Sequence, residues 1–176
     1  MTFTVADKAV LRLVAEKRGI TGKKVFQKLC YFLQEAEGVP LGLRFRMHYY
    51  GPFSDDLDSR MADLAAQRVL ALGELDDGTV EISPGPQISN ALAGEEPYRE
   101  QVECVVKNLG RKGGLRLELL ATAHYLGVLQ DYTGSMSDRH TLAERVRAWK
   151  GAKYEPWFIR QAIKELENLG YLASAS

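Results

Sequence analysis

Side chains able to carry out hydrolytic or transfer chemistry are scattered through this sequence. Such chemistry needs a nucleophile beside a base, a metal cluster or a loop that cradles phosphate. His48, His124 and His140 each stand alone, and neither Cys30 nor Cys104 has a second ligand at the spacing of a zinc site. We therefore expect no catalytic residue, no metal site and no cofactor, and we expect both thiols to be reduced.

Two further segments are weak candidates for chemistry. Arg111-Lys112-Gly113-Gly114 combines glycines and cations, but it lacks the Walker spacing, and Leu115 follows where Lys and Ser/Thr would be needed. His124 lies in a strongly apolar stretch, where a hydrogen-bonded structural histidine is the simpler interpretation. The sequence therefore predicts a protein that is not an enzyme.

The composition describes a folded chain without a global charge. Of its 176 residues 45% are hydrophobic, and 23 Lys and Arg balance 23 Asp and Glu. The charge is uneven, because residues 51–100 carry three basic side chains against eleven acidic ones, whereas the flanking regions are basic. No run approaches the roughly 18 apolar residues of a membrane span, and charge at Asp7 and Lys8 argues against a secretory segment. We expect a cytoplasmic protein that does not associate with membranes.

Apolar residues at helical spacing predict two helices at the start of the chain. The first ends before Gly19, and Thr21 is the expected N-cap of the second. One face of the second helix is apolar, with Val25, Leu29, Phe32 and Leu33. The opposite stripe consists of Lys24, Lys28, Tyr31 and Glu35.

The period then changes from helical to alternating. Residues 43–50 predict a half-buried strand, with Phe45, Met47 and Tyr49 facing inward. Ser54 is expected to cap a third helix with an acidic first turn. Residues 69–72 and 79–82 flank Asp76-Asp77-Gly78 and predict a β-hairpin, which would complete a three-stranded antiparallel sheet with the strand at 43–50.

The second half of the sequence is helical. Its apolar periodicity predicts helices from Pro97 to Leu109, from Leu115 to Leu126, from Leu142 to Trp149 and from Pro156 to Leu169. We therefore expect a mainly α (α+β) fold. It would comprise a winged-helix-like domain at 1–83, a linker at 84–94 and a helical subdomain at 95–176 packed on the first domain.

Two motifs in the first 70 residues resemble known families. One has the spacing Lys24, Lys28, Leu29, Tyr31, Phe32, Leu33; the other is the run from Phe45 to Ser54, followed by an acid-capped helix. They are similar to the YwgA-like family of uncharacterised bacterial proteins and, more distantly, to the Panacea domain of SocA-type antitoxins and phage or prophage proteins. The Panacea resemblance implies a protein-binding module that neutralises a toxin. One known way of doing so is to deliver the toxin to a protease.

We expect the functional surface to be a basic and aromatic stripe beside a rigid turn. Tyr and Arg are frequent at interface hot spots. The chain is thus predicted to be a non-enzymatic protein-interaction module, antitoxin-like or adaptor-like, with a toxin or a protease as its partner. The sequence does not determine the oligomeric state, and a homodimer is among the states that it allows. The predicted partner-binding residues are Lys24, Lys28, Tyr31, Arg46, Tyr50 and Pro52.

The alternative is a winged-helix DNA-binding transcriptional regulator that uses the basic N-terminal face. Its candidate contacts are Lys17, Arg18, Lys23, Lys24, Lys28, Arg44 and Arg46. In a winged helix, however, the helix before the wing normally enters the major groove and should be basic. Here that helix carries Asp55, Asp56, Asp58 and Asp63, so nucleic acid is the second choice.

Overall fold

The computed structural model of this chain describes residues 2–132 and 139–173, with the side chains of 129–132 excepted. Helices dominate it, and the prediction of a mainly α, α+β fold is confirmed. None of the described helices is long and apolar enough to cross a membrane. The helices are α1 (Val5–Lys17), α2 (Lys23–Glu35), α3 (Asp55–Ala66), α4 (Ile88–Ala91), α5 (Arg99–Leu109), α6 (Gly114–Tyr132), α7 (Arg139–Lys150), the 3-10 helix η1 (Gly151–Lys153) and α8 (Pro156–Asn168).

The small antiparallel sheet has three strands, as predicted, but one of them is not the expected strand. Its order is β1 (Ile20–Thr21), β5 (Val80–Pro84), β4 (Leu70–Glu74), with Ile20 opposite Ile82. The predicted strand at 43–50 instead yields β2 (Arg46–His48), which pairs only with β3 (Gly51–Phe53) in a separate hairpin. Thr21 therefore belongs to a strand, and Gly22 is the N-cap residue of α2.

Local capping explains where the first and third helices begin. Thr4 and Asp7 form a capping box at the start of α1, in which each side chain accepts a hydrogen bond from the other residue's backbone N–H. Ser54 Oγ accepts a hydrogen bond from Leu57 N at 3.3 Å, which confirms it as the cap of α3.

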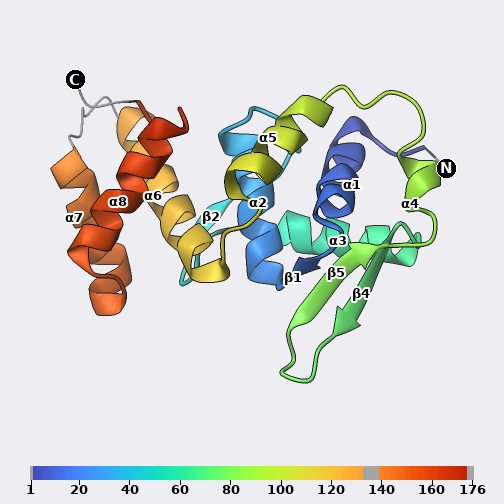
Figure 1. Cartoon of the computed structure of the whole chain (residues 1–176), viewed down its shortest axis with the longest axis horizontal. Coiled ribbons are helices and arrows are strands. Elements are labelled where there is room, and N and C mark those ends of the chain that lie inside the picture. Colours follow the sequence, from blue (N-terminus) through green and yellow to red (C-terminus); the bar gives the residue numbers. More distant parts are fainter. Residues whose placement is uncertain (1, 133–138, 174–176) are drawn as a thin grey trace.

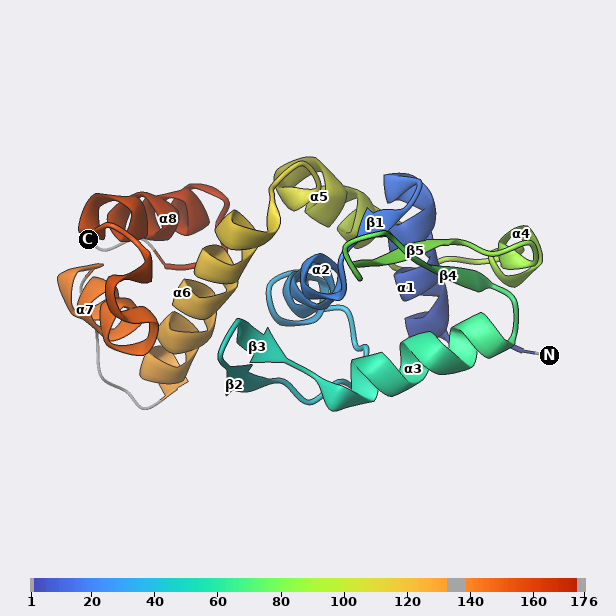
Figure 2. The same ribbon diagram turned by 90° about the horizontal axis from the view of Figure 1, so that it is seen from below.

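Helix α6 is the central helix of the molecule. It lies between α2 on one side and α7 and α8 on the other (Figures 1 and 2). Because α6 is covered on both sides, its apolar side chains Leu117, Leu119, Leu120 and Ala123 are buried whichever way they point. Helix α5 packs against α1 and α2, so a continuous hydrophobic core joins the first and second halves of the chain.

The predicted division into residues 1–83, 84–94 and 95–176 stays a prediction. The segment at 84–94 contains the short helix α4, of which Ala91 is buried in the core. Residue 1 and residues 133–138 and 174–176, which the predicted domains include, lie outside the described residues.

Candidate functional site

A buried carboxylate gathers lysine side chains from three elements and the hydroxyl group of one tyrosine. Glu118 lies on α6 and is fully buried. Its Oε1 lies 3.6 Å from Lys24 Nζ of α2, and its Oε2 lies 3.4 Å from Lys150 Nζ of α7 and 2.8 Å from Lys153 Nζ of η1. Tyr154 donates a hydrogen bond to the same Oε2. These five residues are called the Glu118 cluster below.

The Glu118 cluster ties the β2–β3 turn to the C-terminal helices. Lys150 Nζ also donates a hydrogen bond to the carbonyl of Tyr49 at 2.8 Å. Lys28, on the face of α2 next to β3, donates to the carbonyl of Pro52 at 2.8 Å. Two buried or nearly buried ammonium groups therefore hold the two sides of the turn.

Positive charge exceeds negative charge in this region. Burial raises the pKa of Glu118, but hydrogen bonds from Lys153 and Tyr154 and the nearby lysine charges outweigh it, so the pKa lies below its usual value. The pKa of Lys28 is lowered to about 8, mainly by burial, with smaller lowering effects of Lys150 and Lys24 and an opposing effect of Glu118. Burial likewise lowers the pKa of Lys150. One carboxylate thus faces four ammonium groups.

Gly51 lets β3 approach α6 closely. Its φ of +92° lies in the region that favours glycine. A Cβ atom at this position would lie 3.0 Å from Thr122 Oγ1 and 3.3 Å from Lys28 Cε. Both the positive φ and the lack of space for a Cβ atom therefore favour glycine at position 51.

We expect Gly51→Ala to lower the free energy of unfolding by about 1 to 3 kcal/mol more than Gly78→Ala does, because overpacking adds to the backbone strain. Gly78 is a matched control, since its φ is +83° and a Cβ there would meet nothing within 4 Å. Urea unfolding of both variants measures the difference. Equal losses would show that the approach of β3 to α6 is not tight.

Tyr49 and Tyr50 stand out from the surface at this turn. Their side chains are 79% and 53% exposed, and their rings meet edge to face at 4.9 Å. Lys24 Nζ lies 5.0 Å from the centre of the Tyr50 ring, and Lys153 Nζ lies 5.1 Å from it. Both distances are within the range of cation–π attraction. The prediction that Tyr49 faces inward is wrong, because β2 ends at His48 and the alternation stops there.

An open apolar depression adjoins the tyrosine pair through Lys153. It has a volume of about 700 Å³ and lies between the start of α6 and the start of α8. Leu115 and Trp157 in its lining are 60% and 50% exposed. Gly114 lies beside Lys24, so the depression and the tyrosine pair are contiguous. We call this surface, made of Lys24, Tyr49, Tyr50, Leu115, Lys153 and Trp157, the docking face.

The structure brings only part of the predicted partner-binding stripe to the surface. Lys24 and Tyr50 are partly exposed and lie together, and Arg46 is exposed but forms an ion pair with Asp55. The surface prediction is wrong for Lys28 and Tyr31, each 1% exposed, and for Pro52, which is also buried. The physical reason is that α6 packs on α2 and β3 and covers the stripe that looks polar in the sequence.

Tyr31 and His124 satisfy each other inside the protein. Tyr31 Oη lies 2.7 Å from His124 Nδ1, and His124 also bonds to the backbone of Tyr171. His124 is 1% exposed, and burial lowers its pKa to about 4, so the ring is neutral at pH 7. The interpretation of His124 as a satisfied structural histidine is confirmed.

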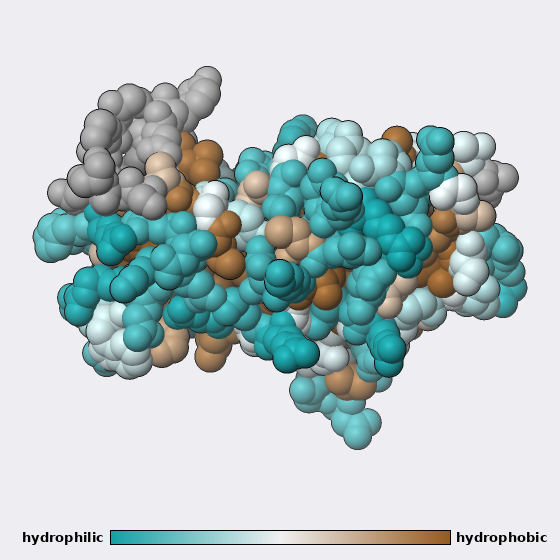
Figure 3. Space-filling view, turned by 45° about the horizontal axis from the view of Figure 1, so that its top comes forward, coloured by the Kyte–Doolittle hydropathy of each residue, from teal (hydrophilic) through white to brown (hydrophobic). Residues whose placement is uncertain are grey.

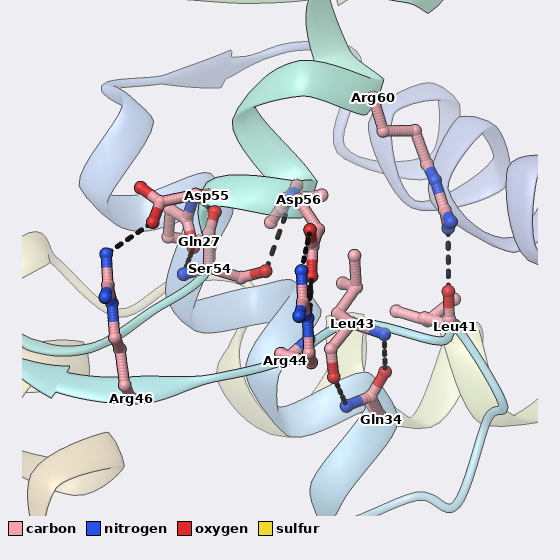
Figure 4. Close-up of polar contacts among 11 residues, drawn as sticks. Gln27, Gln34, Leu41, Leu43, Arg44, Arg46, Ser54, Asp55, Asp56 and Arg60 are labelled. Carbon is pink, nitrogen blue, oxygen red and sulfur yellow. Dashed lines mark hydrogen bonds and ion pairs between the residues drawn. The ribbon is translucent and has the colours of Figure 1, made fainter.

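Three of the seven cations of the basic N-terminal face pair with carboxylates in the acidic middle of the chain. Arg44 binds Asp56 at 3.0 Å, and Arg46 binds Asp55 across the β2–α3 junction (Figure 4). Lys23 lies 4.0 Å from Asp58. Lys17 donates a hydrogen bond to the carbonyl of Gly110. The basic flank and the acidic helix α3 thus complement each other within one molecule.

Sequence reasoning missed Glu118, Lys150, Lys153 and Tyr154. Glu118 carries a usable signal, because it is a carboxylate inside the apolar run Leu117-Glu118-Leu119-Leu120 and must find partners if that run is buried. The lysines carry no such signal.

In residues 2–132 and 139–173 the structure shows no group of three or more His, Cys, Asp or Glu side chains placed to hold a metal ion.

Neither of two comparisons with known proteins finds a match. The sequence matches no model of a known protein family. It also matches no curated protein.

Proposed function

We propose that this protein is a non-enzymatic protein-interaction module of the bacterial cytoplasm, antitoxin-like or adaptor-like, that binds another protein through the docking face. The observation that carries this proposal is the contiguous exposure of Tyr49, Tyr50, Leu115 and Trp157 around two lysines. Large exposed apolar patches with a polar rim mark interaction sites, and Tyr and Trp dominate their binding energy.

The position of the docking face also supports the proposal. Its residues come from α2, the β2–β3 turn, the start of α6, η1 and α8. The Glu118 cluster links all of these elements except α8, which packs against α6. A surface that is already fixed before binding loses less conformational entropy when a partner arrives. This preorganisation supports the proposal that a partner binds here.

The DNA-binding alternative has support from topology but not from charge. The order α1, β1, α2, α3, β4, β5 is compatible with a winged-helix interpretation. The β4–β5 hairpin projects from the body of the molecule (Figure 1) and forms the protrusion at the lower edge of Figure 3. DNA affinity, however, comes largely from free cations that neutralise phosphates. Arg44, Arg46 and Lys23 each have a carboxylate partner within the chain. We therefore place the protein partner first.

Capture of partners on the immobilised protein tests the proposal. We expect a binding partner recovered from a bacterial extract by the wild type to fall at least about tenfold with the double variant Tyr50→Ala/Trp157→Ala, since hot-spot truncation costs about 2 kcal/mol or more. The control is Leu72→Ala/Leu75→Ala, which removes two side chains that are 42% and 41% exposed on the hairpin. Equal recovery by a folded Tyr50/Trp157 variant and the wild type would refute the docking face.

A further inference from the structure

The docking face combines an apolar depression with positive charge that the protein leaves uncompensated. Lys24, Lys150 and Lys153 form ion pairs with one buried carboxylate, Glu118, and Lys28 adds a fourth positive charge nearby. Glu155 is the acidic residue in the lining of the depression. Arg116 in the same lining is already bound by Glu165 at 2.6 Å. The region therefore keeps an excess of positive charge.

The exposed part of this excess lies at the edge of the depression. The side chains of Lys24 and Lys153 are 33% and 28% exposed, whereas that of Lys150 is only 4% exposed. Lys153 borders the depression and also lies 5.1 Å from the Tyr50 ring centre. A group that bound here would touch ammonium groups on one side and the apolar side chains Leu115, Trp157 and Phe158 on the other.

We infer that the partner presents an acidic segment in which an aromatic or large aliphatic side chain fills the depression and neighbouring Asp or Glu carboxylates bind Lys153 and Lys24. This inference rests on the proposed function and names the chemistry of its partner. Charge complementarity of this kind sets specificity and speeds encounter. An incoming carboxylate also relieves the repulsion among the four ammonium groups.

A protein segment fits the face better than single-stranded nucleic acid does. Nucleic-acid grooves of that type combine stacking aromatics with a track of cations along several phosphates. Here the partly exposed cations of the cluster are two lysines beside one depression, and Leu115, Trp157 and Phe158 form its apolar lining. One apolar anchor with adjacent carboxylates matches that pattern.

The probe is a phage-displayed library of random 12-residue peptides, selected on the immobilised full-length protein. We expect the enriched sequences to share at least one Trp, Phe, Tyr, Leu or Ile flanked by two or more Asp or Glu. Fluorescence anisotropy with the resynthesised peptides should show affinity at least about tenfold weaker after Asp and Glu are replaced by Asn and Gln. Affinity should also fall severalfold as ionic strength rises, because the contacts are partly exposed.

Two variants of the protein locate the binding. Lys153→Gln and Leu115→Gln are each expected to weaken the peptide about tenfold, and Leu115 is 60% exposed, so its variant keeps its fold even if Lys153→Gln is unstable. The controls are Lys107→Gln on α5 and Leu72→Gln on β4, both exposed and outside the docking face.

The results that would overturn this inference differ from those that would refute the proposed function. Enriched peptides that are neutral or basic but lose binding to Tyr50→Ala/Trp157→Ala overturn the acidic partner and leave the docking face standing. Acidic peptides that bind Lys153→Gln and Leu115→Gln as well as the wild type, no enrichment at all, or tighter binding of an oligothymidine of 12 nucleotides also overturn it. The capture experiment, which uses no peptide, decides the proposed function separately.

Discussion

Glu118→Ala is expected to lower the free energy of unfolding by about 3 to 5 kcal/mol, the loss typical when one partner of a buried ion pair is removed. Glu118 is fully buried and accepts contacts from Lys24, Lys150, Lys153 and Tyr154. The penalty arises because Lys150, whose side chain is 4% exposed, loses its carboxylate partner. Urea unfolding at pH 7, followed by circular dichroism, measures the change.

Glu103→Ala is the matched control for this prediction. Glu103 forms an ion pair with Arg99 at 3.1 Å, but both side chains are 52% exposed, so its loss should cost no more than about 1 kcal/mol. The double variant Glu118→Ala/Lys150→Met should regain part of the stability lost in Glu118→Ala, since it removes one unpaired ammonium group. A loss for Glu118→Ala no larger than that for Glu103→Ala would contradict the role of the cluster.

The helices of this chain were predictable because the apolar residues that face the core recur at helical spacing. Leu29, Phe32 and Leu33 recur at helical spacing on α2 and are completely buried. Ser54 precedes an acidic turn and caps α3. The two-residue strand β1 was not predictable, since Ile20 and Thr21 are too few to show alternation.

The candidate site was predictable only where it depends on local sequence. The motif itself predicts the exposure of Tyr50, whereas Pro52, which it places at the surface, is buried in β3. Lys28 and Tyr31 looked like a solvent-facing stripe, because an amphipathic pattern does not show that a second helix will cover the polar side. Glu118 and Lys150 are 32 residues apart in the printed sequence, and the meeting of their elements is a matter of tertiary packing.

Lowering the pH from 6.5 to 4 is expected to destabilise the protein by about 3 kcal/mol through His124 alone, in addition to other groups. Burial lowers the pKa of His124 from 6.5 to about 4 in the folded protein. Between these values the unfolded chain binds a proton that the folded chain does not, so stability rises with pH across this window and falls on acidification. Unfolding curves at several pH values measure the slope, which His124 can raise by at most about 1.4 kcal/mol per pH unit.

His124→Gln isolates the contribution of His124, because glutamine does not titrate and all other groups are shared with the wild type. The difference in unfolding free energy between wild type and variant should therefore shrink as the pH falls from 6.5 to 4. Tyr31→Phe provides the complementary control. It removes the 2.7 Å hydrogen bond to His124 Nδ1 and should lower stability by about 1 to 3 kcal/mol, yet it leaves the histidine in place and so should keep the pH slope of the wild type. Identical pH slopes for wild type and His124→Gln would show that the buried ring is not what makes the fold sensitive to acid.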